Sequence, residues 1–197
     1  MELLLATRNE SKVSEIRDLL SELPLEVLSL QDIGFNRILE ETGTTLEENA
    51  LLKARAVFQE LGRPVLADDS GLEVQALEGA PGVYSSRFAG PEATDEENNQ
   101  QLLERMKGLP REERRAQFRT VLALILPGEE PYLLEGRCEG YIACSASGDY
   151  GFGYDPLFVI PEYEQTFAQL GPEIKNNISH RARALEKLKD LLKSEII

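Results

Sequence analysis

Apolar and polar positions change along the chain in a way that predicts strands and helices in turn. A short apolar strand over residues 3–6 precedes a polar loop and then a helix that ends near residue 21. In this helix Val13, Ile16 and Leu20 recur at intervals of three and four, which places them on one face. The chain therefore opens as strand, polar loop and helix, an order that favours an α/β protein.

The same periodicities predict the other elements. Strands are expected over residues 25–28, 65–67, 72–77, 117–126, 132–134 and 139–144, and helices over 45–61, 94–107 and 180–193. Thr45 with Glu48 and Thr94 with Glu97 have the spacing of capping boxes, and Ser179 is placed to cap the last helix. The last three strands predict a long hairpin, a feature that often builds a second lobe.

One apolar run ends abruptly at two carboxylates. The predicted strand over residues 65–67 leads directly into Asp68, Asp69, Ser70 and Gly71. A turn is one interpretation, since Asp, Ser and Gly are frequent turn formers. A functional site is the other, because α/β proteins bind ligands at the carboxyl ends of their strands. We expect both, namely a tight turn that directs the two carboxylates.

Charge and cysteine content exclude several classes of function. Asp and Glu number 35 against 21 Lys and Arg, and the resulting net charge of −14 would repel a nucleic acid. We expect no signal peptide and no membrane contact, because no apolar run approaches the ~20 residues that cross a bilayer. Cys138, Cys144 and one histidine do not match a zinc site, and two reduced thiols fit a cytoplasmic protein.

Three further features indicate a nucleotide. Lys12 follows a polar loop at one helix start, and His180 and Arg181 stand at another, where the helix dipole favours anions. Lys12 could also be an ordinary solvated lysine on a capped helix, and a lone histidine such as His180 could have a structural role. Residues 151–156 alternate glycines with aromatic rings, which would let a flat base approach, although a bulge packing its own rings is equally compatible. Together with the carboxylates, these features suggest a nucleoside triphosphate bound with Mg²⁺ and attacked directly by water.

These blocks, in this order and at this spacing, resemble the inosine triphosphate pyrophosphatase family over essentially the whole chain. The blocks are Thr7-x-Asn9-x-x-Lys12, Glu40-Glu41-Thr42-Gly43 with Glu48-Asn49-Ala50, Ala67-Asp68-Asp69-Ser70-Gly71, Gly79-Ala80-Pro81-Gly82 with Ser86 and Arg87, Gly151-Phe152-Gly153-Tyr154-Asp155-Pro156, and Ser179-His180-Arg181. The resemblance implies an α/β fold with a long, twisted mixed β-sheet flanked by helices. It implies one domain over residues 1–197, with two lobes and a central active-site cleft.

The resemblance also implies an activity and residue roles. The activity is hydrolysis of the purine nucleotides ITP, dITP and XTP to the monophosphate and pyrophosphate, with Mg²⁺, usually by a homodimer. Asp69 would be the general base, and Glu41 and Asp69 would hold the metal. Substrate would be bound by Thr7, Arg8, Asn9, Glu10, Ser11, Lys12, Lys53, Ser70, Phe152, Gly153, Tyr154, Asp155, Lys175, His180 and Arg181. Donors on His180 and Arg181 would favour purines with a keto group at position 6, whereas the role of Asp68 stays open.

The chain departs from the family pattern at two places, and two rival functions are compatible with parts of the sequence. Asp149-Tyr150 and Arg8 stand where the family often has small residues, which could change affinity without changing the chemistry. A related pyrophosphatase for modified pyrimidine nucleotides is disfavoured by the aromatic block and the block at residues 179–181. A non-catalytic nucleotide-binding module would fit better if Asp69 or Lys12 were replaced.

Overall fold

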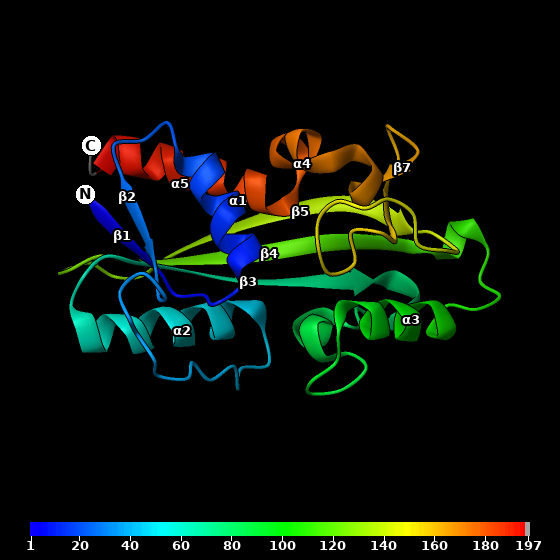
Figure 1. The fold of residues 1–197 in the computed structure, drawn as a ribbon, viewed down its shortest axis with the longest axis horizontal. Coiled ribbons are helices and arrows are strands. Elements are labelled where there is room, and N and C mark those ends of the chain that lie inside the picture. The colour runs from blue at the N-terminus through cyan, green and yellow to red at the C-terminus, as the bar shows by residue number, and fades with distance from the viewer. Residues whose placement is uncertain (196–197) are drawn as a thin grey trace. The chain divides into compact units, whose positions relative to one another are not determined.

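The computed structural model describes residues 1–195 and places seven strands in one sheet, in the order β2-β1-β3-β4-β5-β6-β7 (Figure 1). The strands are β1 (Glu2–Leu5), β2 (Glu26–Ser29), β3 (Val65–Val74), β4 (Arg115–Ile125), β5 (Tyr132–Ile142), β6 (Phe158–Ile160) and β7 (Gln165–Thr166). The helices are α1 (Glu10–Leu20), α2 (Leu46–Leu61), α3 (Asp95–Arg105), α4 (Phe167–Ile178) and α5 (His180–Glu195), with short 3-10 helices η1 (Gln75–Leu77), η2 (Gly82–Arg87) and η3 (Arg111–Glu113).

The sheet is mixed. β1 runs parallel to β2 and β3, with Leu4 paired to Leu28 and to Val65, whereas β6 is antiparallel to both β5 and β7. The predicted α/β class with a mixed sheet and flanking helices is therefore confirmed. No helix among residues 1–195 is both long and apolar enough to cross a membrane.

The chain forms two compact units, each built from separate stretches of sequence. The first unit contains Met1–Asp69, Thr120–Gly136 and the C-terminal segment from Arg181, and the second contains Ser70–Arg119 and Arg137–His180. The expected single domain with a cleft between two lobes stays a prediction.

The core of the first unit follows the strand period of two. Leu3 and Leu5 of β1 and Leu66 of β3 pack with Ile16 of α1 and Leu188 of α5 on one face of the sheet. Successive side chains in a strand point to opposite faces, so the other residues of these strands are directed toward α2, which lies on the opposite side (Figure 1). Helices therefore cover both faces of the parallel part of the sheet.

The core of the second unit is aromatic. The ring of Phe118 on β4 lies 4.6 Å from that of Phe158 on β6, which in turn lies 5.4 Å from the ring of Phe167 on α4. Leu102 and Met106, from α3 and the residue after it, complete the same cluster. Aromatic pairs at these spacings add about 0.5–1.5 kcal/mol each beyond the burial of their area.

The turn predicted at Asp68-Asp69-Ser70-Gly71 is wrong, because β3 continues through these residues without a break. The strand lies between β1 and β4, so its backbone groups are used on both sides and the local preference for a turn is overridden. Gly71 allows a close approach, since a Cβ there would lie 2.3 Å from the carbonyl oxygen of Gly82. As neighbours in a strand, Asp68 and Asp69 point to opposite faces of the sheet.

Other predicted boundaries also change. Residues 72–77 are the end of β3 followed by η1, and the two strands expected over 132–144 are one continuous strand, β5. Strands β6 and β7 and helix α4 were not predicted. In α4, Gly171 has φ 78° and is followed by Pro172, so the helix is kinked at two residues that normally mark a loop.

The predicted caps are partly confirmed. Thr94 and Glu97 form a complete capping box at the start of α3. At α2, Thr45 accepts from the backbone N–H of Glu48, but the Glu48 carboxylate accepts from the N–H of Thr44 at 2.6 Å instead of closing the box. Ser179 precedes α5 as expected, and it also ends α4 by donating its N–H to the carbonyl of Lys175.

Candidate active site

Asp68 lies at the centre of a buried charged group on the α1 and α5 face of β3. Lys12 Nζ donates to its Oδ1 at 3.1 Å, and Arg181 Nη2 donates to its Oδ2 at 3.3 Å. Burial alone would raise the pKa of Asp68, but Lys12, Arg181 and Lys53 lower this pKa far below its usual range. The neighbouring cations therefore favour the ionised form of Asp68, which binds side chains from two helices.

Arg181 is held between two carboxylates. Its guanidinium contacts Asp68 and also Glu15 of α1, and only 1% of the residue is exposed. Burial would lower the pKa of Arg181, but the two carboxylates raise it. Glu15 was not predicted as a site residue. The one feature of the sequence that could have indicated it is its position three residues after Lys12, which places both side chains on one face of α1.

The opposite face of β3 carries a second charged group, centred on Lys53 of α2. Lys53 Nζ donates to Asp69 Oδ1 at 2.8 Å, to Glu41 Oε1 at 2.8 Å and to the Asp68 carbonyl at 2.7 Å. Only 5% of Lys53 is exposed, so this lysine on an apolar helix face points inward and does not extend to solvent. Burial would lower the pKa of Lys53, but Asp69, Glu41 and Asp68 raise it.

Asp69 is the carboxylate in this group whose environment suits a base. Burial raises the pKa of Asp69, and the neighbouring Lys53 only partly offsets this effect. The Asp69 carbonyl accepts from the hydroxyl of Thr120 on β4 at 3.2 Å, which helps to fix the residue. A carboxylate with a raised pKa takes up a proton more readily, a property that is common at catalytic sites.

Glu41 and Asp69 fit a magnesium ion. Both carboxylates lie within 2.8 Å of the same ammonium, so their oxygens are close to one another. Mg²⁺ prefers oxygen ligands and often takes only one or two carboxylates, with water and substrate phosphates completing its shell. Within residues 1–195 no cluster of three or more His, Cys, Asp and Glu side chains suits a metal.

The polar loop before α1 is organised as a helix start. The Asn9 side chain accepts from the N–H of Lys12 at 3.1 Å, and the Thr7 hydroxyl accepts from the N–H of Asn9 at 3.2 Å. Glu10 and Ser11 are exposed in the first turn, where backbone N–H groups have no partner within the helix. A cavity of about 330 Å³ lies beside this loop. The arrangement can receive an anion, as the sequence suggested.

Arg8 has an internal role in this structure. Its guanidinium donates to the carbonyls of Phe35 at 3.2 Å and Arg37 at 3.0 Å. Arg8 therefore holds the segment after β2 against the loop, which accounts for a large residue at this position. Its expected contact with substrate stays a prediction.

In the second unit, Asp155 closes the predicted aromatic loop. Its Oδ2 accepts from the N–H of Phe152 at 3.0 Å and from Lys175 Nζ of α4 at 2.7 Å. The Lys175 ammonium lies 4.5 Å from the centre of the Phe152 ring, which is cation–π distance. Gly151 has φ 81°, and a Cβ there would lie 2.0 Å from Asp155 Oδ2. Only glycine fits at this point of the loop.

The other predicted residues of this unit lie on its core elements. His180 is buried and stacks on Phe118 with 4.8 Å between the ring centres, and Ser70 is half-buried on β3. The structure thus groups the expected residues in two sets: charged side chains around Asp68 and Asp69 in the first unit, and the aromatic loop with Lys175 in the second.

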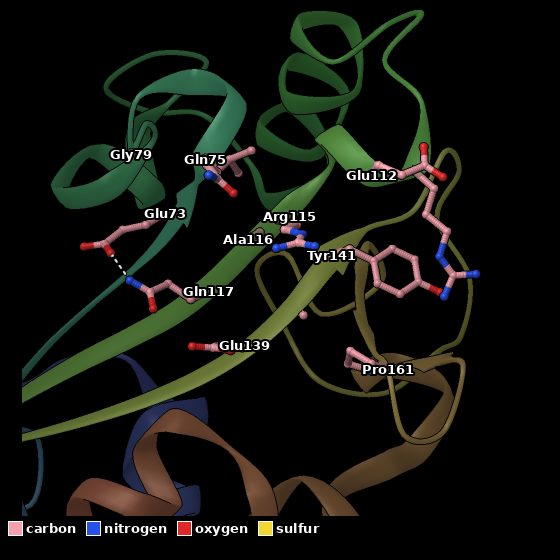
Figure 2. A pocket seen from close by; sticks show the side chains of 13 residues that line it. Glu73, Gln75, Gly79, Glu112, Arg115, Ala116, Gln117, Glu139, Tyr141 and Pro161 are labelled. Atoms are coloured by element: carbon pink, nitrogen blue, oxygen red, sulfur yellow. Dashed lines mark hydrogen bonds between the residues drawn. The ribbon is translucent and has the colours of Figure 1, made fainter.

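A further cavity, of about 720 Å³, lies over β3, β4 and β5 in the second unit (Figure 2). Charged and polar side chains line it, and Gln117 donates to Glu73 across it at 2.6 Å. None of the residues predicted from the sequence for the active site lines this cavity. This cavity is not part of the candidate active site.

A helix start can bind a phosphate group, and buried carboxylates with shifted pKa values are common at functional sites, so this α/β protein has the features of a phosphate-binding enzyme site. The chain belongs to the Ham1 family, whose model matches residues 3–191. The resemblance recognised from the sequence blocks is thereby confirmed.

Relatives match the chain over nearly its full length. The dITP/XTP pyrophosphatase of Bacillus subtilis (strain 168) is 48% identical over 193 residues, which are 98% of this chain and 98% of the relative. That of Desulforamulus reducens is 49% identical over 98% of this chain and 96% of its own. The structure of the Staphylococcus aureus Ham1 protein matches with a TM-score of 0.89 and 39% identity over 99% of this chain and 100% of that one. The structure of a HAM1 protein from Coxiella burnetii also matches with a TM-score of 0.89 and 43% identity, over 98% of this chain and 99% of that one.

Proposed function

We propose that this protein is a nucleoside-triphosphate pyrophosphatase that hydrolyses ITP, dITP and XTP to the monophosphate and pyrophosphate. The observation that carries the proposal is Asp69, a buried carboxylate with a raised pKa that shares the Lys53 ammonium with Glu41. Relatives named dITP/XTP pyrophosphatase, at 48% and 49% identity over almost the whole chain, support the same activity.

The chemistry follows from the two carboxylates. Glu41 and Asp69 would hold Mg²⁺, which, when bound, neutralises the charge of the triphosphate. Asp69 accepts a proton from water, the water oxygen forms a bond to the α-phosphorus, and the bond from this phosphorus to the bridging oxygen breaks. Pyrophosphate leaves with the electron pair. General-base assistance of this kind contributes roughly 10²–10⁴-fold to the rate.

Cations of the first unit suit the phosphates. Lys12 and Lys53 both contact Asp68, one at its carboxylate and the other at its carbonyl, and the first turn of α1 adds its backbone N–H groups. A chain with a net charge of −14 needs such local positive charge to hold a triphosphate. Preorganised charges of this kind stabilise the charge that develops on the leaving pyrophosphate.

Residues of the second unit suit the base and sugar. We assign the base to the loop of Phe152, Gly153, Tyr154 and Asp155, with His180 and Lys175 as donors, of which Lys175 contacts the loop directly. A donor that faces position 6 of the purine would bind a keto group and reject an amino group, a mismatch that can discriminate strongly. Arg181 is proposed to share this role, and its contacts with Asp68 and Glu15 would hold its guanidinium in place.

The raised pKa of Asp69 predicts the pH dependence. Because the ionised carboxylate is the active form, kcat/KM for ITP is retained above the pKa of Asp69 and falls as the pH drops through it. Burial raises this pKa in the metal-free protein, so Asp69 should titrate above the ordinary value of 3.8 there. The measurement is an NMR titration of the Asp69 carboxyl carbon without Mg²⁺, restricted to the range in which circular dichroism shows folded protein. Bound Mg²⁺ would lower the same pKa, because a nearby cation favours the carboxylate. A metal-free pKa at or below 3.8 would argue against a desolvated base.

Gly151 and Gly153 offer a matched pair of substitutions. Both have positive φ, at 81° and 60°, but a Cβ at 151 meets Asp155 Oδ2 at 2.0 Å, whereas nothing lies within 4 Å of one at 153. We expect the clash at position 151 to cost about 1.4 kcal/mol of binding free energy, which corresponds to a factor of ten. Gly151→Ala should therefore raise KM for ITP about tenfold more than Gly153→Ala. Steady-state kinetics of both variants give the comparison, and equal KM values would show that the loop tolerates the clash.

The substrate panel that tests the proposal is pyrophosphate release from ITP, XTP, ATP, GTP and a modified pyrimidine triphosphate, with and without Mg²⁺. We expect Mg²⁺-dependent release that is fastest with ITP and XTP. Preference for the pyrimidine would favour the rival pyrophosphatase, and binding without turnover would favour a non-catalytic module.

Two properties implied by the family resemblance belong to the same proposal. We propose that the protein is a homodimer and that it is cytoplasmic, where nucleoside triphosphates are made and used. Light scattering after gel filtration tests the first property, with a dimer at twice the 22.0 kDa of the chain.

A further inference from the structure

Two side chains of α3 bind both backbone groups of one residue in the aromatic loop. The N–H of Gly153 donates to Asp95 Oδ2 at 2.6 Å, and Asn99 Nδ2 donates to the Gly153 carbonyl at 3.0 Å. Asp95 and Asn99 are separated by one turn of helix, so they lie on the same face of α3. One helix face thus holds the peptide groups on either side of the Gly153 Cα.

A third contact holds the next residue of the loop. The hydroxyl of Tyr154 donates to the carbonyl of Ser85 in η2 at 2.7 Å. Burial raises the pKa of Tyr154, so its hydroxyl keeps the proton that it donates. The Asn98 side chain of α3 in turn accepts from the N–H of Ala89 at 2.8 Å and donates to the Ser86 carbonyl at 3.1 Å. Helix α3 therefore supports the loop directly and through the segment around η2.

Gly153 depends on these contacts more than its neighbours do. It has no side chain, and nothing lies within 4 Å of the position that a Cβ would occupy. Phe152 and Asp155, by contrast, are tied to each other and to Lys175. The bonds from Asp95 and Asn99, together with the backbone bond from the Asp155 N–H to the Phe152 carbonyl at 3.2 Å, therefore fix how the backbone passes from the Phe152 ring to the Tyr154 ring.

We infer that Asp95 and Asn99 are positioning residues for the purine base, which hold the loop from Phe152 to Tyr154 in the arrangement that receives it. This inference rests on the proposed function. Lys53 of the catalytic group binds Asp69, Glu41 and the Asp68 carbonyl, whereas Asp95 and Asn99 bind the backbone of Gly153, so their effect belongs to base binding and not to the attack of water. A loss of binding that is equal in ground state and transition state raises KM and leaves kcat unchanged.

Asp95→Ala provides the test, with Glu96→Ala as its matched control. Both residues are exposed acids in the first turn of α3, so both substitutions remove one charge that favours the helix dipole. Only Asp95 accepts from Gly153. A hydrogen bond to a charged group is strong enough that its loss should raise KM for ITP by about tenfold, with kcat within about twofold of wild type. Glu96→Ala should leave both constants near wild type.

Two further variants separate positioning from general structural damage. Asp95→Asn keeps an oxygen that can accept from Gly153, so it should recover most of the lost affinity. Asn99→Ala should raise KM about as much as Asp95→Ala, whereas Gln100→Ala, at an exposed neighbouring position, should not. Hydrogen–deuterium exchange of the peptide over residues 149–157 should be faster in Asp95→Ala and Asn99→Ala than in the two controls.

The outcomes are distinct. Equal KM values for Asp95→Ala and Glu96→Ala, or a fall confined to kcat, would overturn the inference while the wild-type activity stands. A wild-type protein that releases no pyrophosphate from any purine triphosphate would overturn the proposed function, and with it the role in base binding. Unchanged exchange in Asp95→Ala would show that the helix does not hold the loop, whatever the activity.

Discussion

Asp69→Asn should lower the rate of pyrophosphate release from ITP by about 10²–10⁴-fold, the contribution expected of a general base. The amide has nearly the same shape as the carboxylate, and its oxygen can still accept from Lys53, which lies 2.8 Å from Oδ1 in the native protein. What the amide cannot do is take a proton from water. The loss should therefore appear in kcat, while the protein remains folded.

Two controls make this result specific. Asp190→Asn changes an exposed aspartate on α5 and should leave the rate unchanged. Titration with Mg²⁺ separates the two roles of Asp69, because a defect in metal binding alone would be relieved at high Mg²⁺ and a missing base would not. A rate near that of wild type in the folded variant would remove Asp69 from the role of base.

Asp68→Asn should lower the free energy of unfolding by about 3–5 kcal/mol, the usual cost of removing one member of a buried ion pair. Asp68 is 1% exposed and contacts both Lys12 and Arg181, so its neutral replacement leaves two cations in a buried site with less compensation. Urea denaturation at neutral pH measures the loss. A change below about 1 kcal/mol would be typical of a surface ion pair and would contradict the buried network.

A double-mutant cycle identifies the partner. Arg181→Met alone leaves Asp68 with Lys12, whereas Asp68→Asn with Arg181→Met removes both opposed charges. The double variant should lose less stability than the sum of the single variants, because residues in direct contact are coupled. Additive losses would show that the two side chains act independently.

The stabilisation by Asp68 also has a defined pH dependence. Its pKa is lowered in the folded state, so this contribution is fully present above the ordinary value of 3.8 and is lost as the pH falls below it. The wild-type protein should therefore lose stability in acid more steeply than Asp68→Asn, which has already lost this contribution.

Elements with a clear apolar period could be predicted from the sequence. Helices α1, α2 and α3 and strand β1 lie within a few residues of their expected ranges, because burial of one face dominates their energetics. The continuity of β3 through residues 68–71 could not be predicted, since the turn preferences of Asp68, Asp69 and Gly71 are local, whereas pairing with two neighbouring strands depends on the whole sheet. Helix α4 was missed because Gly171 and Pro172 interrupt its pattern.

The residues of the candidate site could likewise be predicted from the sequence only in part. Lys53 could be predicted as a site residue because a charge on an apolar helix face is unusual. The structure shows it buried against Asp69 and Glu41. Glu15 could not be predicted as a site residue, because its partner Arg181 is 166 positions away in the sequence. Asp95 likewise carries an ordinary signal for a helix start, and only the folded chain shows that it binds Gly153.

Hydrolysis of ITP in water labelled with oxygen-18 tests the central claim most directly, because it reports the products and the phosphorus that is attacked in one experiment. Attack by water on the α-phosphorus predicts inosine monophosphate with one heavy oxygen and unlabelled pyrophosphate, both read by mass spectrometry. Label in the pyrophosphate, or release of inosine diphosphate with labelled phosphate, would contradict the account.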